Sequence, residues 1–255
     1  DSLFSEAVNC DIPGVSAAVV AKEESLYQGH FVFADLNQNK PIDDSSLFRI
    51  ASMTKAVTSV CIFQLIEKGV ISLDSPLKNF FPEVSEKKII DGFDDEGNPI
   101  MSDPSNDITV GNLLTHTSGL SDSLVAQNGK PKPTCFDEVL NRIYEQPLMF
   151  QPGTDFSYST PAFEVLVELI QKTSGLEWEQ LSKKLLFEPM GMTNSYFNTP
   201  KAPNNQAIPL FNRAMEIDHL PNDSGLELHH HFKFNMGGGN GLSNPIDIAI
   251  FCQMM

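Results

Sequence analysis

The spacing of apolar residues divides the chain into recognisable elements. Two β-rich runs, Val15–Ala21 and Leu26–Phe33, are separated by a short polar stretch and predict an antiparallel hairpin. Further along, apolar residues recur at helical spacing from about Ser52 to Lys68, and Gly69 follows as the C′ residue. The chain therefore opens with paired strands and continues into a buried helix.

From about residue 76 the composition changes and helical patterns dominate. Aspartate, glycine and proline cluster in 91–104. The helical segments that follow are Val110–Leu114, Phe136–Glu145, Pro161–Thr173 and Trp178–Leu186. Thr160 reads as an N-cap with Pro161 at N1, and Gly175 reads as the residue just past the helix end. This part is typical of a mostly helical insertion.

The last segment returns to the first kind of structure. Asn244-Pro245 predicts another capped helix, and the apolar run Ile246–Met255 has no C-cap, so we expect the chain to be a piece of a longer protein. The predicted fold is α/β (α+β), an antiparallel sheet flanked by helices with a mostly helical insertion domain. Its expected parts are 1–75, the insertion 76–214, and 215–255, which returns to the α/β domain and stops before the last strands.

Composition narrows the possible partners. The chain has 17 Lys+Arg against 33 Asp+Glu, a formal net charge of -16, which argues against nucleic-acid and membrane-surface binding. It has no apolar run long enough for a transmembrane helix. The cysteines lack C-x-x-C spacing, so neither a disulfide framework nor a zinc site is expected, and Cys61 should be a small buried hydrophobe. A signal peptide could have been removed, so a periplasmic or secreted location is favoured and the oligomeric state stays open.

Ser52-Met53-Thr54-Lys55 is the motif that carries chemistry. Residues at i and i+3 are neighbours on one helix face, so the Ser52 hydroxyl and the Lys55 amine can meet. A serine becomes a nucleophile when a neighbouring base takes its proton, and a lysine in a desolvated pocket can be that base. The competing interpretation is an N-cap serine followed by a solvated lysine.

Three further segments complete the pattern. Residues 113–120 read Leu-Leu-Thr-His-Thr-Ser-Gly-Leu, and Tyr158-Ser159-Thr160 stands immediately before a helix. The third segment, 237–242, is rich in glycine, which lets the backbone approach a ligand or another strand closely. Tyr158 could also be a core aromatic residue whose hydroxyl is satisfied.

With these motifs the chain resembles the serine β-lactamase and penicillin-binding-protein superfamily, and within it the class C β-lactamases and family VIII carboxylesterases. Residues 48–55 match the nucleophile motif, and 92–94 with 97–100 match the loop before the 113–120 run. The glycine stretch and Asp247 match the family's late segment. The resemblance covers nearly the whole chain, from Pro13 to the last helix.

The resemblance implies acyl transfer through an acyl-enzyme on Ser52, without a metal or other cofactor. Lys55 would accept a proton or lower its partner's pKa, and Tyr158 would act first as general base and then as acid. The helix that follows Tyr158 and the nearby lysine cation should both lower the tyrosine pKa. Thr160, Gly238 and Gly239 would contribute to substrate binding, and the Ser52 N–H would supply half of an oxyanion hole.

Two departures from the family pattern bear on the substrate. Thr160 stands where β-lactamases usually carry asparagine, which favours the esterase or peptidase branch. The K-T-G, H-x-G or W-x-G strand is absent, since Lys172-Thr173-Ser174-Gly175 falls at a helix end, and we expect the true strand beyond Met255. We therefore predict esterase-type hydrolysis of small esters or amides. The alternatives are a β-lactamase, a D-Ala-D-Ala carboxypeptidase, or a catalytically silent binding or assembly protein.

The remaining conspicuous residues are interpreted as having no role in catalysis or metal binding. His116 is expected to stabilise a turn by a hydrogen bond rather than to act as a base. His229–His231 are adjacent and point in different directions, so a solvated loop is favoured over a metal site. The run 91–97 superficially resembles a calcium loop, but Phe93 occupies a position that needs an oxygen ligand.

Overall fold

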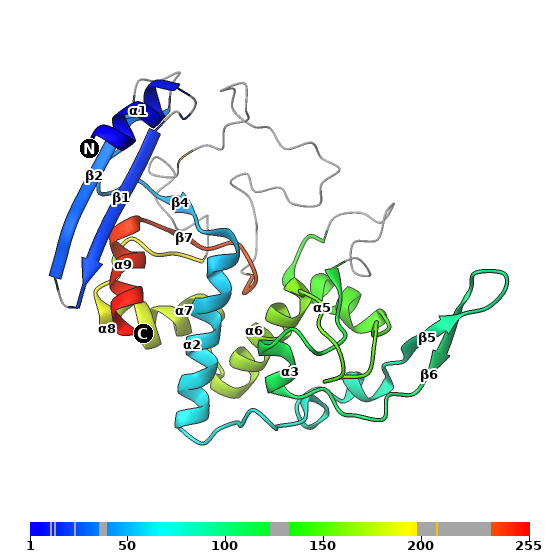
Figure 1. Cartoon of the computed structure of the whole chain (residues 1–255). Helices are drawn as coiled ribbons and strands as arrows, with labels where there is room; N and C mark the ends of the chain where they lie inside the picture. The colour runs from blue at the N-terminus through cyan, green and yellow to red at the C-terminus, as the bar shows by residue number, and fades with distance from the viewer. Residues whose placement is uncertain are drawn as a thin grey trace. The chain divides into compact units, whose positions relative to one another are not determined.

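The computed structural model describes residues 1–10, 12, 14–22, 24–35, 40–122, 133–197, 208 and 236–255. Its helices are α1 (Ser2–Cys10), α2 (Thr54–Glu67), α3 (Val110–Leu114), α5 (Phe136–Glu145), α6 (Thr160–Ser174), α7 (Trp178–Ser182), α8 (Glu188–Met190) and α9 (Pro245–Met254). Its strands are β1 (Gly14–Ala21), β2 (Glu24–Asp35), β3 (Lys40–Pro41), β4 (Phe48–Arg49), β5 (Ile89–Phe93), β6 (Pro99–Ser102) and β7 (Leu242–Ser243). Figure 1 shows these elements along the chain.

The structure divides into two compact units. The first unit consists of 1–50, 183–233 and 240–255, and the second of 51–182 with 234–239. The predicted division at residues 76 and 214 remains a prediction.

The first unit is built on an antiparallel sheet in the order β1-β2-β3. The predicted hairpin is confirmed, with Val15 opposite Phe31 and Ala17 opposite Gly29. Helix α9 packs on β1 and α1 on β2, so helices flank this sheet. A second antiparallel pair joins β4 to β7. Helix α1 was not predicted from the sequence.

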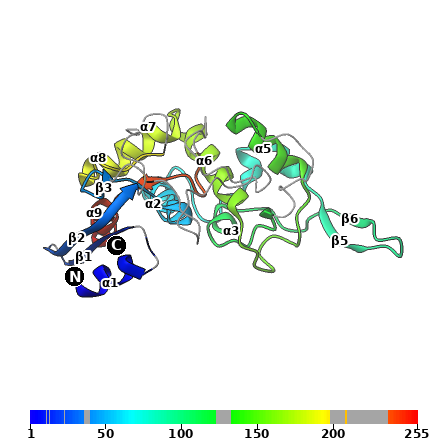
Figure 2. The ribbon, with the colours of Figure 1, turned by 90° about the horizontal axis from the view of Figure 1, so that it is seen from above.

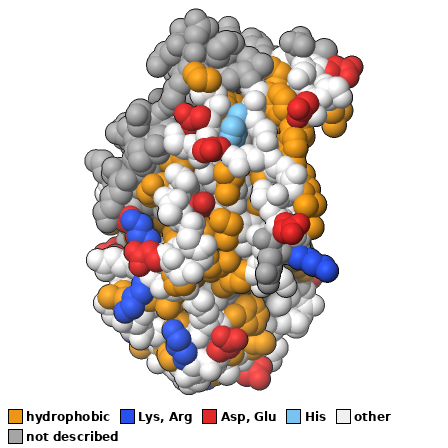
Figure 3. All heavy atoms as spheres, turned by 90° about the vertical axis from the view of Figure 1, so that its left-hand side faces the viewer, with side chains coloured by type: hydrophobic (Ala, Val, Ile, Leu, Met, Phe, Trp, Pro, Cys, Tyr) orange, Lys and Arg blue, Asp and Glu red, His pale blue; other side chains and the backbone are white. Residues whose placement is uncertain are grey.

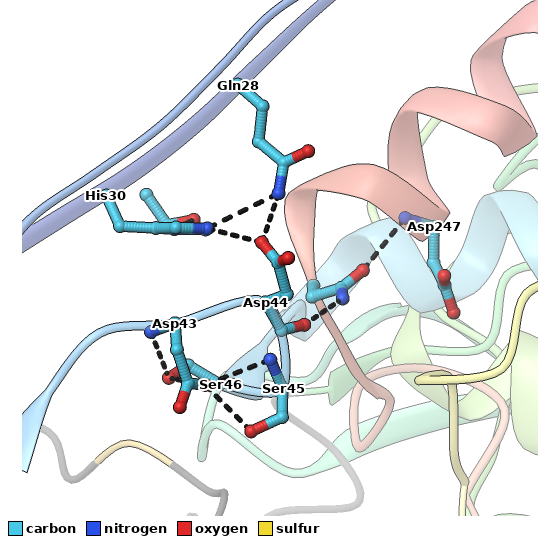
Figure 4. A network of polar contacts seen from close by, with 9 residues as sticks. Gln28, His30, Asp43, Asp44, Ser45, Ser46 and Asp247 are labelled. Atoms are coloured by element: carbon cyan, nitrogen blue, oxygen red, sulfur yellow. Dashed lines mark hydrogen bonds and ion pairs between the residues drawn. The ribbon is translucent and has the colours of Figure 1, made fainter.

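Polar contacts tie the parts of the first unit together (Figure 4). On β2, His30 Nε2 lies 2.7 Å from Asp44 Oδ1, and Gln28 bonds to the same carboxylate. Asn244 Nδ2 donates to the Asp44 carbonyl at 2.7 Å, while its Oδ1 accepts the Asp247 N–H at 2.8 Å. Asn244 is therefore the N-cap of α9, as predicted, and connects that helix to the 43–46 turn.

Helix α6 is the centre of the second unit. Nine of its residues are buried on all sides of the helix, and it packs against α2, α3, α5 and α7 (Figures 1 and 2). The run of buried residues from Pro161 to Val167 covers every side of its first two turns, which fits this central position. The N-cap is Ser159, whose hydroxyl accepts the Ala162 N–H at 3.1 Å, and not Thr160 as predicted. Both residues are good caps, so the sequence left a one-residue ambiguity.

Other predicted boundaries in this unit were tested by the structure. Helices α3 and α5 have the predicted limits, and Gly175 ends α6 with φ 69°. The segment 91–104 contains most of the β5–β6 hairpin, and Asp94 in its connecting loop accepts N–H groups from Glu96 and Asn98. The predicted helix Trp178–Leu186 is interrupted, because a π-helical turn begins at Lys183.

A buried lysine caps the end of α5. Lys87 is 4% exposed, and its Nζ donates to the carbonyl oxygens of Ile143 (2.7 Å), Tyr144 (3.2 Å) and Gln146 (2.7 Å). The last carbonyl groups of a helix lack partners within the helix, and a cation near that end is favourable. Burial lowers the pKa of Lys87 to about 8.

The predicted burial of Cys61 is confirmed. Cys61 is fully buried on α2, and burial raises the pKa of its thiol to about 12. Acidic side chains are dispersed over the face shown in Figure 3, among apolar and uncharged ones. Within the described ranges, every helix is too short or too polar to cross a bilayer.

Candidate active site

The predicted nucleophile and lysine lie together at the start of α2. Ser52 sits in a 3-10 turn, Ala51–Met53, and is exposed, whereas Lys55 in the first turn of α2 is 7% exposed. Lys55 Nζ donates to Ser52 Oγ at 3.4 Å and to the Gly238 carbonyl oxygen at 2.6 Å. Ala51 has φ 43°, a left-handed conformation that costs energy for a residue with a side chain. The backbone is thus strained next to Ser52.

Tyr158 joins this pair from the segment before α6. The Lys55 Nζ lies 4.8 Å from the centre of its ring, and the tyrosine is 48% exposed. Burial opposes ionisation of the phenol, but hydrogen bonds with Ser52 and Lys55 and the lysine charge outweigh it, so the pKa of Tyr158 is lowered. The structure therefore brings the three predicted catalytic residues into one cluster, within the second unit.

His116 lies against the ring of Tyr158. Its Nδ1 accepts the Ser159 N–H at 3.0 Å, and its imidazole stacks on Tyr158 with ring centres 4.5 Å apart. The pKa of His116 is lowered by burial and then by the positive charge of Lys55. An imidazole that accepts a backbone N–H is held in its neutral form with the proton on Nε2. The imidazole therefore bonds to the segment before α6, 43 positions along the chain, and not within its own turn as predicted, and it contacts the tyrosine ring.

Thr160 lies beside the glycine segment. Its N–H donates to Asp122 Oδ2 at 3.0 Å. A Cβ added at Gly238 would lie 2.5 Å from the Thr160 methyl carbon. Thr160 is half-buried between these neighbours, and its role in substrate binding stays a prediction.

The glycines are required where the chain touches α6. A Cβ at Gly237 would lie 2.2 Å from Val167 Cγ2 and 2.8 Å from the Phe163 carbonyl oxygen. At Gly239, in contrast, a Cβ would meet no atom within 4 Å. Gly237 and Gly238 therefore allow close packing, whereas Gly239 faces open space in this part of the structure.

This difference gives a paired prediction for stability. Gly237→Ala should reduce the free energy of unfolding by about 1–3 kcal/mol, because the new methyl group displaces backbone as well as a side chain. Gly239→Ala should change it by less than about 0.5 kcal/mol, because no neighbour has to move. Urea unfolding of both variants measures the two effects. Equal effects of the two substitutions would contradict the assigned packing.

Glu164 was not recognised from the sequence, although it belongs to this cluster. It is 1% exposed, and its carboxylate accepts the N–H groups of Gly237 (2.9 Å) and Gly238 (3.0 Å). A glutamate at an apolar-facing position of a predicted helix is the one signal that could have indicated it. Its partners lie more than seventy positions away along the chain.

Metal ligands do not gather in the described part of the chain. None of its groups of three or more His, Cys, Asp or Glu side chains could hold an ion. His229–His231 lie outside the described residues. The lookalike Lys172-Thr173-Ser174-Gly175 falls at the C-terminal end of α6, as predicted.

Known proteins with a similar sequence or fold carry related names. Lovastatin esterase from Penicillium rubens is 30% identical over 77% of this chain and 52% of its own length. Esterase EstB from Burkholderia gladioli is 29% identical over 82% of this chain and 53% of its own. Other relatives bear the names of acyltransferases. The chain thus spans about half the length of the curated relatives it matches.

A solved structure and a family model complete the comparison. A mutant simvastatin synthase from Aspergillus terreus has a TM-score of 0.76 and 26% identity, over 99% of this chain and 64% of that one. The Beta-lactamase family model matches residues 1–255. The fold is therefore β-lactamase-like, and the chain belongs to the Beta-lactamase family, which includes esterases and acyltransferases.

Proposed function

We propose that this chain carries the nucleophile of a serine hydrolase that cleaves small esters through an acyl-enzyme on Ser52. The observation that carries the proposal is the cluster of Ser52, Lys55 and Tyr158, with Lys55 Nζ 3.4 Å from the serine oxygen and 4.8 Å from the tyrosine ring. A nucleophile beside a cation and a tyrosine of lowered pKa has the parts that acyl transfer needs.

In the proposed reaction Tyr158, as phenolate, takes the proton of Ser52 Oγ while that oxygen bonds to the ester carbonyl carbon. The carbonyl becomes an oxyanion, to which the Ser52 N–H donates. When the carbon–oxygen bond to the alcohol breaks, Tyr158 returns the proton to the departing alkoxide. Water then attacks the acyl carbon while Tyr158 takes a proton from it. The bond from that carbon to Ser52 Oγ breaks, Tyr158 returns the proton to Oγ, and the acid is released. The Lys55 ammonium favours the phenolate throughout.

Esters are preferred over lactams and D-alanyl peptides for two reasons. Thr160 lacks the amide group that asparagine offers at this position in β-lactamases. Two of the relatives similar to this chain are named as esterases. A β-lactamase or D-Ala-D-Ala carboxypeptidase activity is the alternative outcome.

A substrate panel tests the proposal. The purified protein is incubated with p-nitrophenyl butyrate, a chromogenic cephalosporin and a D-alanyl-D-alanine peptide, and intact mass spectrometry looks for an acyl adduct. We expect turnover of the butyrate ester and a butyryl adduct on the peptide that contains Ser52. No turnover of any substrate and no adduct would instead support a catalytically silent binding protein.

The pH dependence follows from the lowered pKa of Tyr158. Acylation should become faster as pH rises, because the phenol cannot accept a proton until it ionises. In Lys55→Met the cation and its hydrogen bond are lost, so the tyrosine should titrate at higher pH than in the wild-type protein. Ultraviolet titration of Tyr158 in both proteins measures this without requiring activity. An unchanged titration in Lys55→Met would show that the lysine does not lower the tyrosine pKa.

Acyl transfer to an alcohol is a second candidate, supported by the relatives named as acyltransferases. Water and an alcohol would compete for the same acyl-enzyme. Adding increasing concentrations of a primary alcohol to the p-nitrophenyl butyrate assay tests this, with the new ester and free butyrate measured by chromatography. If the protein favours transfer, the ratio of new ester to free butyrate should exceed the molar ratio of alcohol to water.

A further inference from the structure

A short glycine segment is held between two helices of the second unit beside Lys55. Residues 236–239 lie against α2 and α6, and each helix supplies polar side chains that bond to the glycine backbone. From α6, the Glu164 carboxylate accepts the N–H groups of Gly237 and Gly238 with one oxygen each. From α2, Thr58 Oγ1 donates to the Gly237 carbonyl at 2.8 Å, and Lys55 Nζ donates to the Gly238 carbonyl at 2.6 Å.

The peptide group between Gly237 and Gly238 is therefore fixed at both ends. Glu164 holds its N–H and Thr58 holds its carbonyl oxygen. The next carbonyl oxygen, that of Gly238, is the shortest contact of the Lys55 amine, at 2.6 Å against 3.4 Å to Ser52 Oγ. The place of the amine beside Ser52 and Tyr158 thus depends on where this peptide lies.

A buried carboxylate is a costly way to hold two peptide N–H groups. Glu164 is 1% exposed, and burial raises its pKa to about 7, against the lowering effect of the two glycine N–H bonds and of Lys55. An apolar residue here would leave both glycine N–H groups buried without this acceptor, so the carboxylate is tied to the glycine backbone rather than to packing of the core.

We propose that Glu164 is a positioning residue, which fixes the Gly237–Gly238 backbone and thereby holds the Lys55 amine against Ser52 and Tyr158. Glu164 is 1% exposed and both of its carboxylate oxygens accept glycine N–H groups, so it acts through the peptide and not on a substrate. The inference rests on the proposed function for its catalytic consequence, but the placement of Lys55 can be measured independently.

Glu164→Gln is the first test, and Glu168→Gln is its matched control. The amide keeps the size of the side chain, but its NH2 group faces one of the glycine N–H donors, so one bond is lost and a donor meets a donor. Glu168 lies one turn further along α6, is also partly buried, and accepts from Tyr144 away from Lys55. Both substitutions remove one partly or fully buried carboxylate from the same helix.

The first readout is the ultraviolet titration of Tyr158, obtained by subtracting the Tyr158→Phe variant. Burial raises the pKa values of Tyr144 and Tyr196, which separates their titration from that of Tyr158. The groups facing Tyr158 are Ser52, Lys55, Asp122 and the stacked His116. In Glu164→Gln we expect the Tyr158 midpoint to rise by about one pH unit. In Glu168→Gln it should stay where it is in the wild-type protein.

The second readout is labelling of Ser52 by a fluorophosphonate probe, together with the kinetics of p-nitrophenyl butyrate hydrolysis. Glu164→Gln should slow labelling and lower kcat by about tenfold to a hundredfold, with KM within about twofold, because a misplaced amine affects the chemical step. Glu168→Gln should label at nearly the wild-type rate. A role in stability alone would lower the unfolding midpoint without moving the Tyr158 titration.

A second variant covers the case in which Glu164→Gln does not fold. Thr58→Val removes the other bond to the same peptide without changing charge, and it should move the Tyr158 midpoint and the labelling rate in the same direction by a smaller amount. If a folded Glu164→Gln or Thr58→Val protein titrates and labels as the wild type does, the positioning role is wrong. If the wild-type protein itself does not label, the proposed function fails while the titration still decides the role of Glu164.

Discussion

Replacing Ser52 with alanine should lower the hydrolysis of p-nitrophenyl butyrate by at least about 10³-fold. The alanine methyl group cannot form the acyl-enzyme, so only direct attack by water on a bound ester remains. Lys55 keeps its bond to the Gly238 carbonyl, which does not involve the serine, so the fold of the site should be unchanged. Initial rates, the butyryl adduct and the unfolding midpoint are measured on the same preparation.

Ser59→Ala is the matched control for this prediction. Ser59 lies on the same helix and its hydroxyl donates to the Lys55 carbonyl oxygen at 2.8 Å, a local bond within α2. This variant should keep its rate within about threefold of the wild type, since the lost bond is away from the reacting atoms. A Ser52→Ala protein that retained a tenth of the activity would place the nucleophile elsewhere.

Replacing Lys87 with methionine should reduce the free energy of unfolding by roughly 2–4 kcal/mol. Methionine fills a similar volume, but the carbonyl groups of Ile143, Tyr144 and Gln146 lose their buried donor at the end of α5. Removing the buried ammonium recovers part of its desolvation cost, which keeps the effect below the sum of the three bonds. Urea unfolding at neutral pH measures the change.

The neighbouring residue Lys88 provides the comparison. Its Nζ lies 2.5 Å from Asp103 Oδ1, but the two side chains are 49% and 82% exposed. Exposed ion pairs contribute little, so Lys88→Met should change stability by less than about 0.5 kcal/mol. Adjacent lysines with the same substitution would then differ severalfold in effect. Similar losses for both would mean that Lys87 contributes charge alone and not the cap of α5.

The fold could be predicted largely where local signals were strong. Helices α3 and α5 and the β1–β2 hairpin followed from apolar spacing, and the cap of α9 followed from Asn244 and Pro245. The sequence predicts only a loop in the region of the β5–β6 hairpin, because the glycine and aspartate residues there give no alternating apolar pattern for the short strands that Asp94 connects. The break at Lys183 has no distinct local signature, since π-helical turns use ordinary helix-forming residues.

In the candidate site, too, only residues that belong to local motifs could be predicted from the sequence. Ser52, Lys55 and Tyr158 were identified because their motifs are local, and the structure brings them together. Glu164 could not be identified in the same way, because its carboxylate meets the glycines only after the chain has returned to α6. A helix residue whose partners are distant in sequence carries no short motif. Such residues are found by tracing what each buried charge touches.

The long separation in sequence between Lys55 and its glycine partner has a consequence for how this site becomes reactive. Helices α2 and α6 precede residues 237–239 in the chain, and Gly238 is separated from Lys55 by 183 positions. Contacts that close such long loops form slowly in folding. Until they form, Lys55 lacks its Gly238 partner and the charge of Glu164 is unmatched. Ser52 should therefore gain its reactivity in a late folding step, so that probe labelling during refolding lags behind the recovery of helical circular dichroism.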